Sequence, residues 1–150
     1  MMLNKFPPHT TLPAILRFLD SCPRYSKRNR CLYALRQVLR IKDIAALRVS
    51  DVINQDGTVR NYFTSQIDGV RVQFDRDMRS EIQRYLRFLY SVPASESLEQ
   101  ILESDTEISL FPTQKKACFS SNTLAQLYSY QDRLVHGYFK PNVAKLIQAA

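Results

Sequence analysis

Basic side chains crowd into one short part of this 150-residue chain, and the chemistry they suit is the binding of polyanions. Nine lysines and arginines lie between Arg17 and Arg48 against only Asp20 and Asp43, so this part holds an excess of +7, the formal charge of the whole chain. Residues 95–110 carry five carboxylates and no base. Such polarity favours binding to a phosphate backbone. The alternative is an ordinary basic protein whose charged runs are solvated surface.

The other reactive side chains are few and isolated. Cys22, Cys31 and Cys118 are odd in number and lack the paired spacing of metal ligands, which favours buried free thiols. His9 and His136 are expected to be ordinary surface or partly buried histidines. The sequence therefore predicts no metal site and no cofactor.

The elements that must position the basic residues are mostly helices. Thr11 before Leu12 and Pro13 is typical of a helix start. Apolar residues at three-to-four spacing predict further helices, and two β-branched, aromatic segments around Asp68-Gly69 predict a hairpin. The expected order is helices over 11–20, 27–39 and 41–48, strands over 59–64 and 70–74, helices over 77–90, around 98–102 and from Ser121 or Asn122 to about Tyr130, and a short helix over 142–150. This is a mainly α protein with a small antiparallel β-hairpin, an α+β fold.

Arg40 and Asp43 stand at the junction of two predicted helices, and Leu47 and Asp51 follow before the hairpin. This order and spacing, over about residues 11–130, resembles the first half of the catalytic domain of tyrosine recombinases, the phage-integrase family. The resemblance implies that Arg40 takes the place of the family's first phosphate-holding arginine and that Asp43 braces it. Val38 stands where the family usually has glycine, so the helix end before Arg40 is altered.

The hairpin lacks the family's general acid. The resemblance implies a lysine near Ser65 or Gln66, which would protonate the leaving oxygen, but no lysine lies between Lys42 and Lys115. Arginine cannot replace it, because the guanidinium does not release a proton near neutral pH.

The family's His-x-x-Arg motif and its nucleophile region are also missing. Residues 110–112 and 120–127 resemble the approach to that motif, but no arginine follows His136 at the required spacing. Tyr138 is a tyrosine near the end of the chain in a context that does not match the nucleophile, so a packing or surface aromatic is the favoured interpretation. No intact catalytic set is expected.

The resemblance still implies a DNA face. Arg40 would hold a phosphate, Asn122, Thr123 and Gln126 would reach base edges, and the lysines before them would contact the backbone. The residues expected to contact DNA are Arg36, Arg40, Lys42, Arg48, Lys115, Lys116, Asn122, Thr123 and Gln126. The alternative is an unrelated helical protein with one hairpin, in which Arg40 extends from a helix end to solvent.

These observations predict an N-terminal extension over 1–10 and a single integrase-like, C-terminally shortened domain over 11–150. The expected function is binding of double-stranded DNA without catalysis, as a regulator or accessory factor of a mobile element, plasmid or phage. Because no N-terminal clamp domain precedes the first helix, tight binding would require a homodimer or a partner protein.

Two alternatives remain: an active or trans-complemented site-specific recombinase, and a protein-interaction module that uses residues 95–110 or the hairpin edge. No apolar run is long enough to span a membrane, and the protein is expected in the cytoplasm, associated with the nucleoid.

Overall fold

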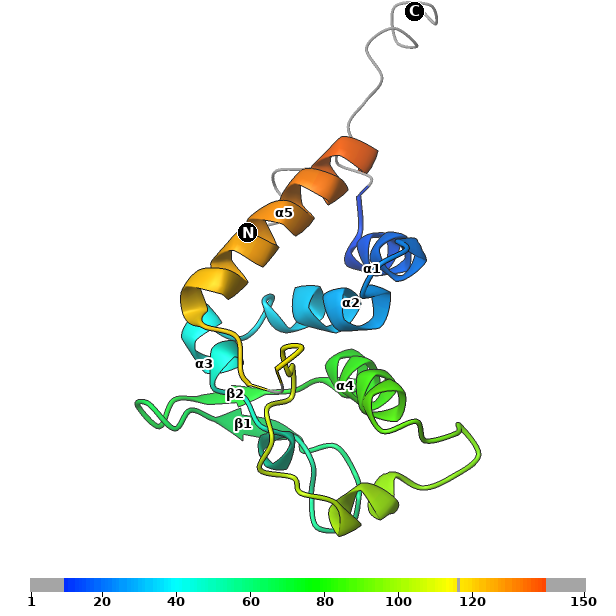
Figure 1. The fold of residues 1–150 in the computed structure, drawn as a ribbon, viewed down its shortest axis with the longest axis vertical. Helices are drawn as coiled ribbons and strands as arrows, with labels where there is room; N and C mark the ends of the chain where they lie inside the picture. Colours follow the sequence, from blue (N-terminus) through cyan, green and yellow to red (C-terminus); the bar gives the residue numbers. More distant parts are fainter. Residues whose placement is uncertain (1–9, 116, 140–150) are drawn as a thin grey trace, which may run out of the picture.

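The computed structural model describes residues 10–115 and 117–139, and it is mainly helical with one small antiparallel sheet (Figure 1). The expected α+β class is confirmed. Predictions on His9, Lys116 and a helix over 142–150 lie outside the described residues. The elements are α1 (Leu12–Ser21), α2 (Ser26–Leu35), α3 (Ile41–Ala45), the 3-10 helix η2 (Val49–Asp51), β1 (Tyr62–Thr64), β2 (Arg71–Gln73), α4 (Arg76–Leu89), the 3-10 helix η3 (Leu98–Glu103) and α5 (Ser121–Phe139).

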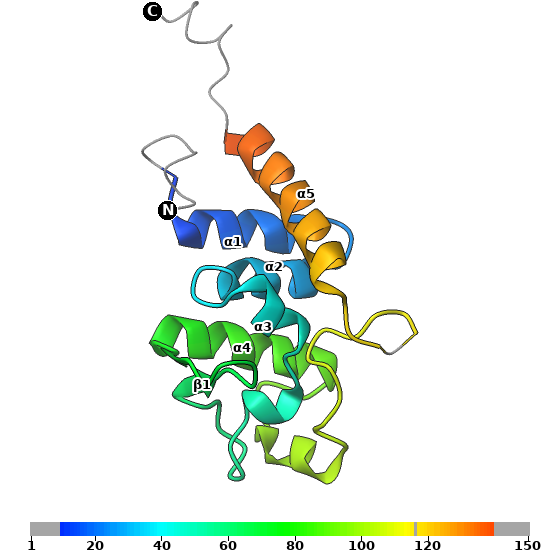
Figure 2. The ribbon, with the colours of Figure 1, turned by 90° about the vertical axis from the view of Figure 1, so that its left-hand side faces the viewer.

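Helix α2 lies at the centre of the molecule and packs against α1, α4 and α5. Figures 1 and 2 show it between α1 and α4, with α5 crossing beside it. Five consecutive residues of α2, from Cys31 to Leu35, are buried, because neighbouring helices cover most of its surface. Burial of the apolar faces of several helices around one central helix supplies the main stabilising term of the fold.

The start of α1 and the span of α4 agree with the sequence to within two residues. The Thr11 hydroxyl accepts a hydrogen bond from the Ala14 amide at 3.3 Å, and the Asp75 carboxylate accepts one from Met78 at 2.8 Å. Both are N-caps, which satisfy amides that have no partner inside the helix. In α4 the apolar stripe of Met78, Ile82, Tyr85 and Leu86 is buried, as its spacing predicts.

Three predicted helix ends are wrong, and the smallest error is in α3, which ends at Ala45 rather than near Arg48. Helix α2 ends at Leu35 rather than Leu39, because the amides of Gln37 and Val38 bond to carbonyls three residues back and form a tight turn. Leu39 is still buried, but Val38 is exposed, so the helical spacing did not continue through the turn.

Helix α5 continues to Phe139, nine residues past the predicted end at Tyr130. Its buried side chains include Leu124, Tyr128 and Val135, and the position between the last two is Gln131. Because a polar residue interrupts the buried apolar stripe, the hydrophobic spacing did not predict that the helix continues.

The β-hairpin has the expected antiparallel pairing but shorter strands. Phe63 pairs with Val72 at its centre, and Phe63 is buried against the core while the neighbouring strand residues face solvent. At the tip, the Ser65 amide donates to the Val70 carbonyl at 2.8 Å and the Gly69 amide donates to the Ser65 carbonyl at 2.9 Å. The tip is therefore a closed turn that projects from the body beside α3 (Figure 1).

Candidate nucleic-acid interface

Arg40 precedes the first turn of α3, where its extended backbone directs the side chain toward the hairpin. Its Nε donates to Oδ2 of Asp43 at 2.7 Å. The other oxygen of Asp43 accepts from the Ser65 hydroxyl at 2.7 Å, and the Asp43 side chain is 4% exposed. A buried carboxylate thus joins α3 to the hairpin tip and fixes the direction of the guanidinium.

The remaining nitrogens of Arg40 bind a second carboxylate. Nη1 and Nη2 donate to the two oxygens of Asp68 at 2.7 and 2.9 Å, a bidentate pair at the hairpin tip. Hydrogen bonds from Arg40 hold the pKa of the Asp68 carboxyl well below its usual range. Since a phosphate uses the same paired N–H groups, Asp68 occupies the place at which Arg40 would hold a phosphate. Nothing in the sequence between Arg40 and Asp68 predicts this contact.

Ser65 stands where the resemblance places the family's lysine, and its hydroxyl is committed to the structure. Besides donating to Asp43, it accepts from the Ile67 amide at 3.1 Å and from Arg40 Nη2 at 3.3 Å. Ser65 is buried, while Gln66 beside it is exposed. A serine hydroxyl held in this way fixes the turn and offers no cationic acid.

The first turns of α5 lie next to α3, so sequence-distant polar residues share one side of the molecule. Figure 1 shows the start of α5, α3 and the hairpin following one another along the same side, which faces the viewer in Figure 2. The exposed side chains on these elements and on the loop before α5 include five of the expected DNA contacts, Lys42, Lys115, Asn122, Thr123 and Gln126. Within the described residues, Lys42 and Lys115 form no ion pair.

Arg36 and Arg48 were expected on the DNA face, and both are engaged with carboxylates. Arg36 is 13% exposed and pairs with Asp132 of α5 at 2.9 and 3.2 Å, with its guanidinium 4.6 Å from the Tyr128 ring centre. It therefore links α2 to α5. Arg48 pairs with Glu107 at 3.1 Å on the surface, where such a pair contributes about 1 kcal/mol or less.

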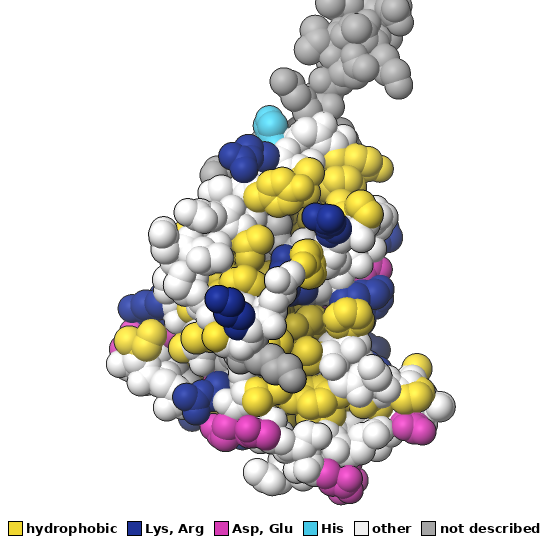
Figure 3. All heavy atoms as spheres, in the orientation of Figure 1, with side chains coloured by type: hydrophobic (Ala, Val, Ile, Leu, Met, Phe, Trp, Pro, Cys, Tyr) yellow, Lys and Arg dark blue, Asp and Glu magenta, His cyan; other side chains and the backbone are white. Residues whose placement is uncertain are grey.

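The fold offsets much of the charge excess that the sequence places in residues 17–48. Five of the nine basic residues there form ion pairs, namely Lys27, Arg30, Arg36, Arg40 and Arg48. The partners include four carboxylates from outside the segment, Asp68, Glu81, Glu107 and Asp132. Basic side chains are spread over the face in Figure 3, and the acidic ones lie mainly toward its lower end. The basic surface is therefore weaker than a count along the sequence implies.

The remaining candidate residues lie away from Arg40 or carry no ligand geometry. Tyr138 stacks on Phe18 of α1 at 4.2 Å between ring centres, at the end of α5 opposite to α3 (Figure 1). His136, two residues earlier, is exposed. The three cysteines are unpaired, and Cys118 is exposed rather than buried as expected. In residues 10–115 and 117–139, no group of three or more His, Cys, Asp or Glu side chains is arranged to hold a metal ion.

None of the helices in the described part of the chain combines the length and the apolar character of a membrane span. No protein-family model matches the chain, and no curated protein or solved structure matches it.

Proposed function

We propose that this protein binds double-stranded DNA without cutting it, through the face formed by α3, the hairpin tip and the first turns of α5, on an integrase-like fold. The observation that carries the proposal is the position of Arg40, braced by buried Asp43 and aimed along the hairpin tip. A guanidinium held in this way pays little conformational entropy when it binds a phosphate.

The polar side chains around Arg40 suit contact with a duplex. Lys42 and Lys115 offer charges for the backbone, and Asn122 and Gln126 offer amides able to bond base edges in the major groove. A DNA phosphate at Arg40 takes the place of the Asp68 carboxylate, so binding is an exchange of one anion for another. This exchange makes affinity modest for one monomer and favours binding as a dimer or with a partner protein.

The absence of cleavage is inferred from the groups around Arg40. The hairpin tip carries Ser65 and Asp68 where a proton donor is needed, and a carboxylate of lowered pKa does not supply a proton at neutral pH. Such a protein would act as a regulator or accessory factor of a mobile element, plasmid or phage.

The test is a titration of a DNA duplex, followed by fluorescence anisotropy, at several salt concentrations. Each phosphate contact contributes about 0.9 to the slope of log K against log salt. Replacing Lys42 and Lys115 by glutamine is expected to lower the slope by about two. The matched control replaces Arg84 and Arg133, two exposed arginines elsewhere, and is expected to leave the slope nearly unchanged although the net charge falls equally.

Two results would contradict the proposal. The first is a wild-type protein that fails to bind the duplex at low salt. The second is a covalent protein–DNA adduct on a nicked suicide substrate, which would show cleavage by the chain itself.

A further inference from the structure

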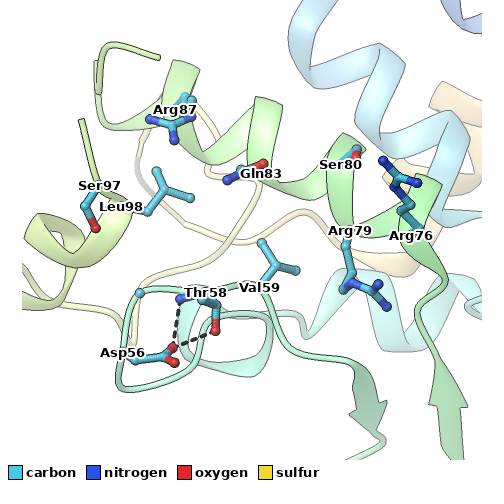
Figure 4. A pocket seen from close by; sticks show the side chains of 11 residues that line it. Asp56, Thr58, Val59, Arg76, Arg79, Ser80, Gln83, Arg87, Ser97 and Leu98 are labelled. Atoms are coloured by element: carbon cyan, nitrogen blue, oxygen red, sulfur yellow. Dashed lines mark hydrogen bonds between the residues drawn. The ribbon is translucent and has the colours of Figure 1, made fainter. Parts of the chain in front are cut away.

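A groove runs along the side of α4 that faces the loop over residues 54–59 (Figure 4). Its volume is about 370 Å³. One wall is a stripe of α4 with helical spacing, and the other is formed by residues 56–59 and the start of η3. The polar residues of the helical wall are Arg76, Arg79, Ser80, Gln83 and Arg87.

The three arginines of this stripe form no ion pair with any residue that the structure describes. Arg79 donates to the Phe74 carbonyl at 2.6 Å, and Arg87 donates to two loop carbonyls, those of Pro93 and Glu96, at 2.7 and 2.8 Å. Arg76 forms no hydrogen bond or ion pair with any residue that the structure describes. Carbonyl partners orient a guanidinium but carry no net charge, and each guanidinium has five N–H groups, so donors remain for a ligand.

The acidic residue in the lining is bonded to its own turn. Oδ1 of Asp56 accepts from the amide and the hydroxyl of Thr58 at 3.0 and 2.6 Å, which Figure 4 marks with dashed lines. These hydrogen bonds lower the pKa of the Asp56 carboxyl, so it stays ionised. Three arginines against one aspartate leave two positive charges in the lining.

The close packing of the wall opposite α4 depends on a glycine. Gly57 is buried with φ of +87°, and a Cβ there would lie 2.6 Å from the backbone nitrogen of Glu99. The loop therefore packs directly on η3, and the groove keeps its shape without a ligand.

The spacing of the cations along α4 indicates the kind of anion. Arg76 and Arg87 are eleven residues apart, which is about 16 Å along a helix that rises 1.5 Å per residue. Figure 4 shows them toward opposite ends of the groove, with Ser80 and Gln83 between. A single small anion cannot contact all the arginines of this row at once, whereas a row of phosphates can contact several of them. Guanidinium groups pair with phosphate through parallel N–H bonds.

We propose that this groove binds a ligand that carries several phosphate groups in a row, either a stretch of nucleic-acid backbone or a free polyphosphate. Asp68 lies at the tip of the hairpin and Arg76 just after its base, so the groove is separate from the face around Arg40. Phosphate binding in this groove therefore does not depend on DNA binding at the face around Arg40.

The test is a titration of the full-length ¹⁵N-labelled protein with sodium triphosphate at constant ionic strength, followed by the backbone amides of residues 56–59 and the arginine Nε–H signals. Wild type should show saturable shifts at these signals. Replacing Arg76 and Arg87 by glutamine should weaken binding at least about tenfold, because two of three charged contacts are lost. The control that replaces Arg84 and Arg133 by glutamine should bind like wild type. The absence of saturable shifts, or equal affinity of the two double variants, would overturn the proposal.

Two further measurements complete the design. If loss of Arg87 unfolds the loop whose carbonyls it binds, the single variant Arg76→Gln keeps the test valid, because the Arg76 side chain has no partner among the described residues. This variant is expected to weaken triphosphate binding about threefold or more. Adding unlabelled DNA duplex distinguishes the ligand sources. Displacement of triphosphate, together with a lower salt slope in the Arg76/Arg87 variant, assigns the groove to nucleic-acid backbone. Triphosphate binding that DNA does not displace assigns it to free polyphosphate.

Discussion

Arginines in two regions of this protein have different partners, and the difference decides what each region offers to a ligand. Around Arg40, two carboxylates hold the guanidinium, one of them buried. In the α4 groove, backbone carbonyls hold Arg79 and Arg87. The first arrangement fixes geometry and removes charge, while the second fixes geometry and leaves charge. The available positive charge of a surface therefore depends on which partners the fold brings to each arginine.

The position of the carboxylates also separates the two regions. Asp43 is buried and tied to the hairpin, so the Arg40 cluster is part of the packed structure. Asp56 in the groove is exposed and bonded within its own turn. A change in the Arg40 cluster is thus expected to affect the fold, whereas a charge change in the groove is expected to affect binding.

The largest expected effect compares two glycines, one in each region. Gly57 and Gly69 both have positive φ, but only at Gly57 does an added Cβ meet other atoms, 2.6 Å from Glu99 N. Gly57→Ala should lower the free energy of unfolding by about 2 kcal/mol or more, from backbone strain together with a clash. Gly69→Ala should cost about 1 kcal/mol, from strain alone. Urea unfolding measures both, and equal losses would show that the 54–59 loop is not packed on η3.

The second prediction compares two carboxylates. Asp43→Ala removes acceptors from Arg40 Nε and from the buried Ser65 hydroxyl, so the free energy of unfolding should fall by about 2 kcal/mol. Asp56→Ala, which breaks hydrogen bonds only within an exposed turn, should change it much less. Thermal unfolding of the two variants checks the order. A larger loss for Asp56→Ala would reverse the assignment of Asp43 as the structural carboxylate.

The local parts of this fold were predictable from sequence, because their causes are local. The Thr11 cap, the Asp68-Gly69 turn and the apolar stripe of α4 each arise from residues a few positions apart. The end of α2 was not predictable, since apolar residues follow Leu35 at nearly helical spacing while the backbone turns. The last nine residues of α5 were hidden by Gln131, whose amide donates to the Asn29 carbonyl at the α2 side of the core.

Only the part of the candidate site around Arg40 could be predicted from the sequence. The resemblance to tyrosine recombinases implied that Asp43 braces Arg40, and the two side chains do form an ion pair. The pairs Arg36–Asp132 and Arg40–Asp68 join residues far apart in sequence, and no period or motif encodes such a meeting. The α4 groove was missed for a related reason. The residues on the polar side of α4 look like ordinary solvated positions until the 54–59 loop is placed opposite them.

A smaller effect is expected when the anion at Arg40 is removed. Asp68→Asn keeps the size of the side chain but releases the bidentate ion pair, so Arg40 can bind a phosphate without exchange. DNA affinity at low salt should rise about threefold to tenfold, and the salt slope should steepen by about one. Asp105→Asn, the same charge change in the acidic segment, is the control. Triphosphate binding in the α4 groove should stay unchanged in both variants. A change there would show that the groove and the face around Arg40 are not independent binding regions.

The smallest effect concerns the pKa values of one exposed carboxylate in each region. Asp68 and Asp56 both have a pKa below the ordinary 3.8, the first chiefly through hydrogen bonds from Arg40 and the second chiefly through hydrogen bonds from Thr58. A depressed folded-state pKa means that each interaction stabilises the protein above pH 3.8 and is lost as the pH falls through the lower folded value.

The causes can be separated by NMR titration of the side-chain carboxyl carbons. Arg40→Gln should return the pKa of Asp68 toward its ordinary value and leave Asp56 unchanged, and Thr58→Val should do the reverse. Added salt should raise the pKa of Asp68 more than that of Asp56, because salt screens a charged partner and acts little on a neutral hydroxyl. Equal salt sensitivity would mean that Asp56 senses the nearby arginines, and the groove would then hold less free charge than its carbonyl partners imply.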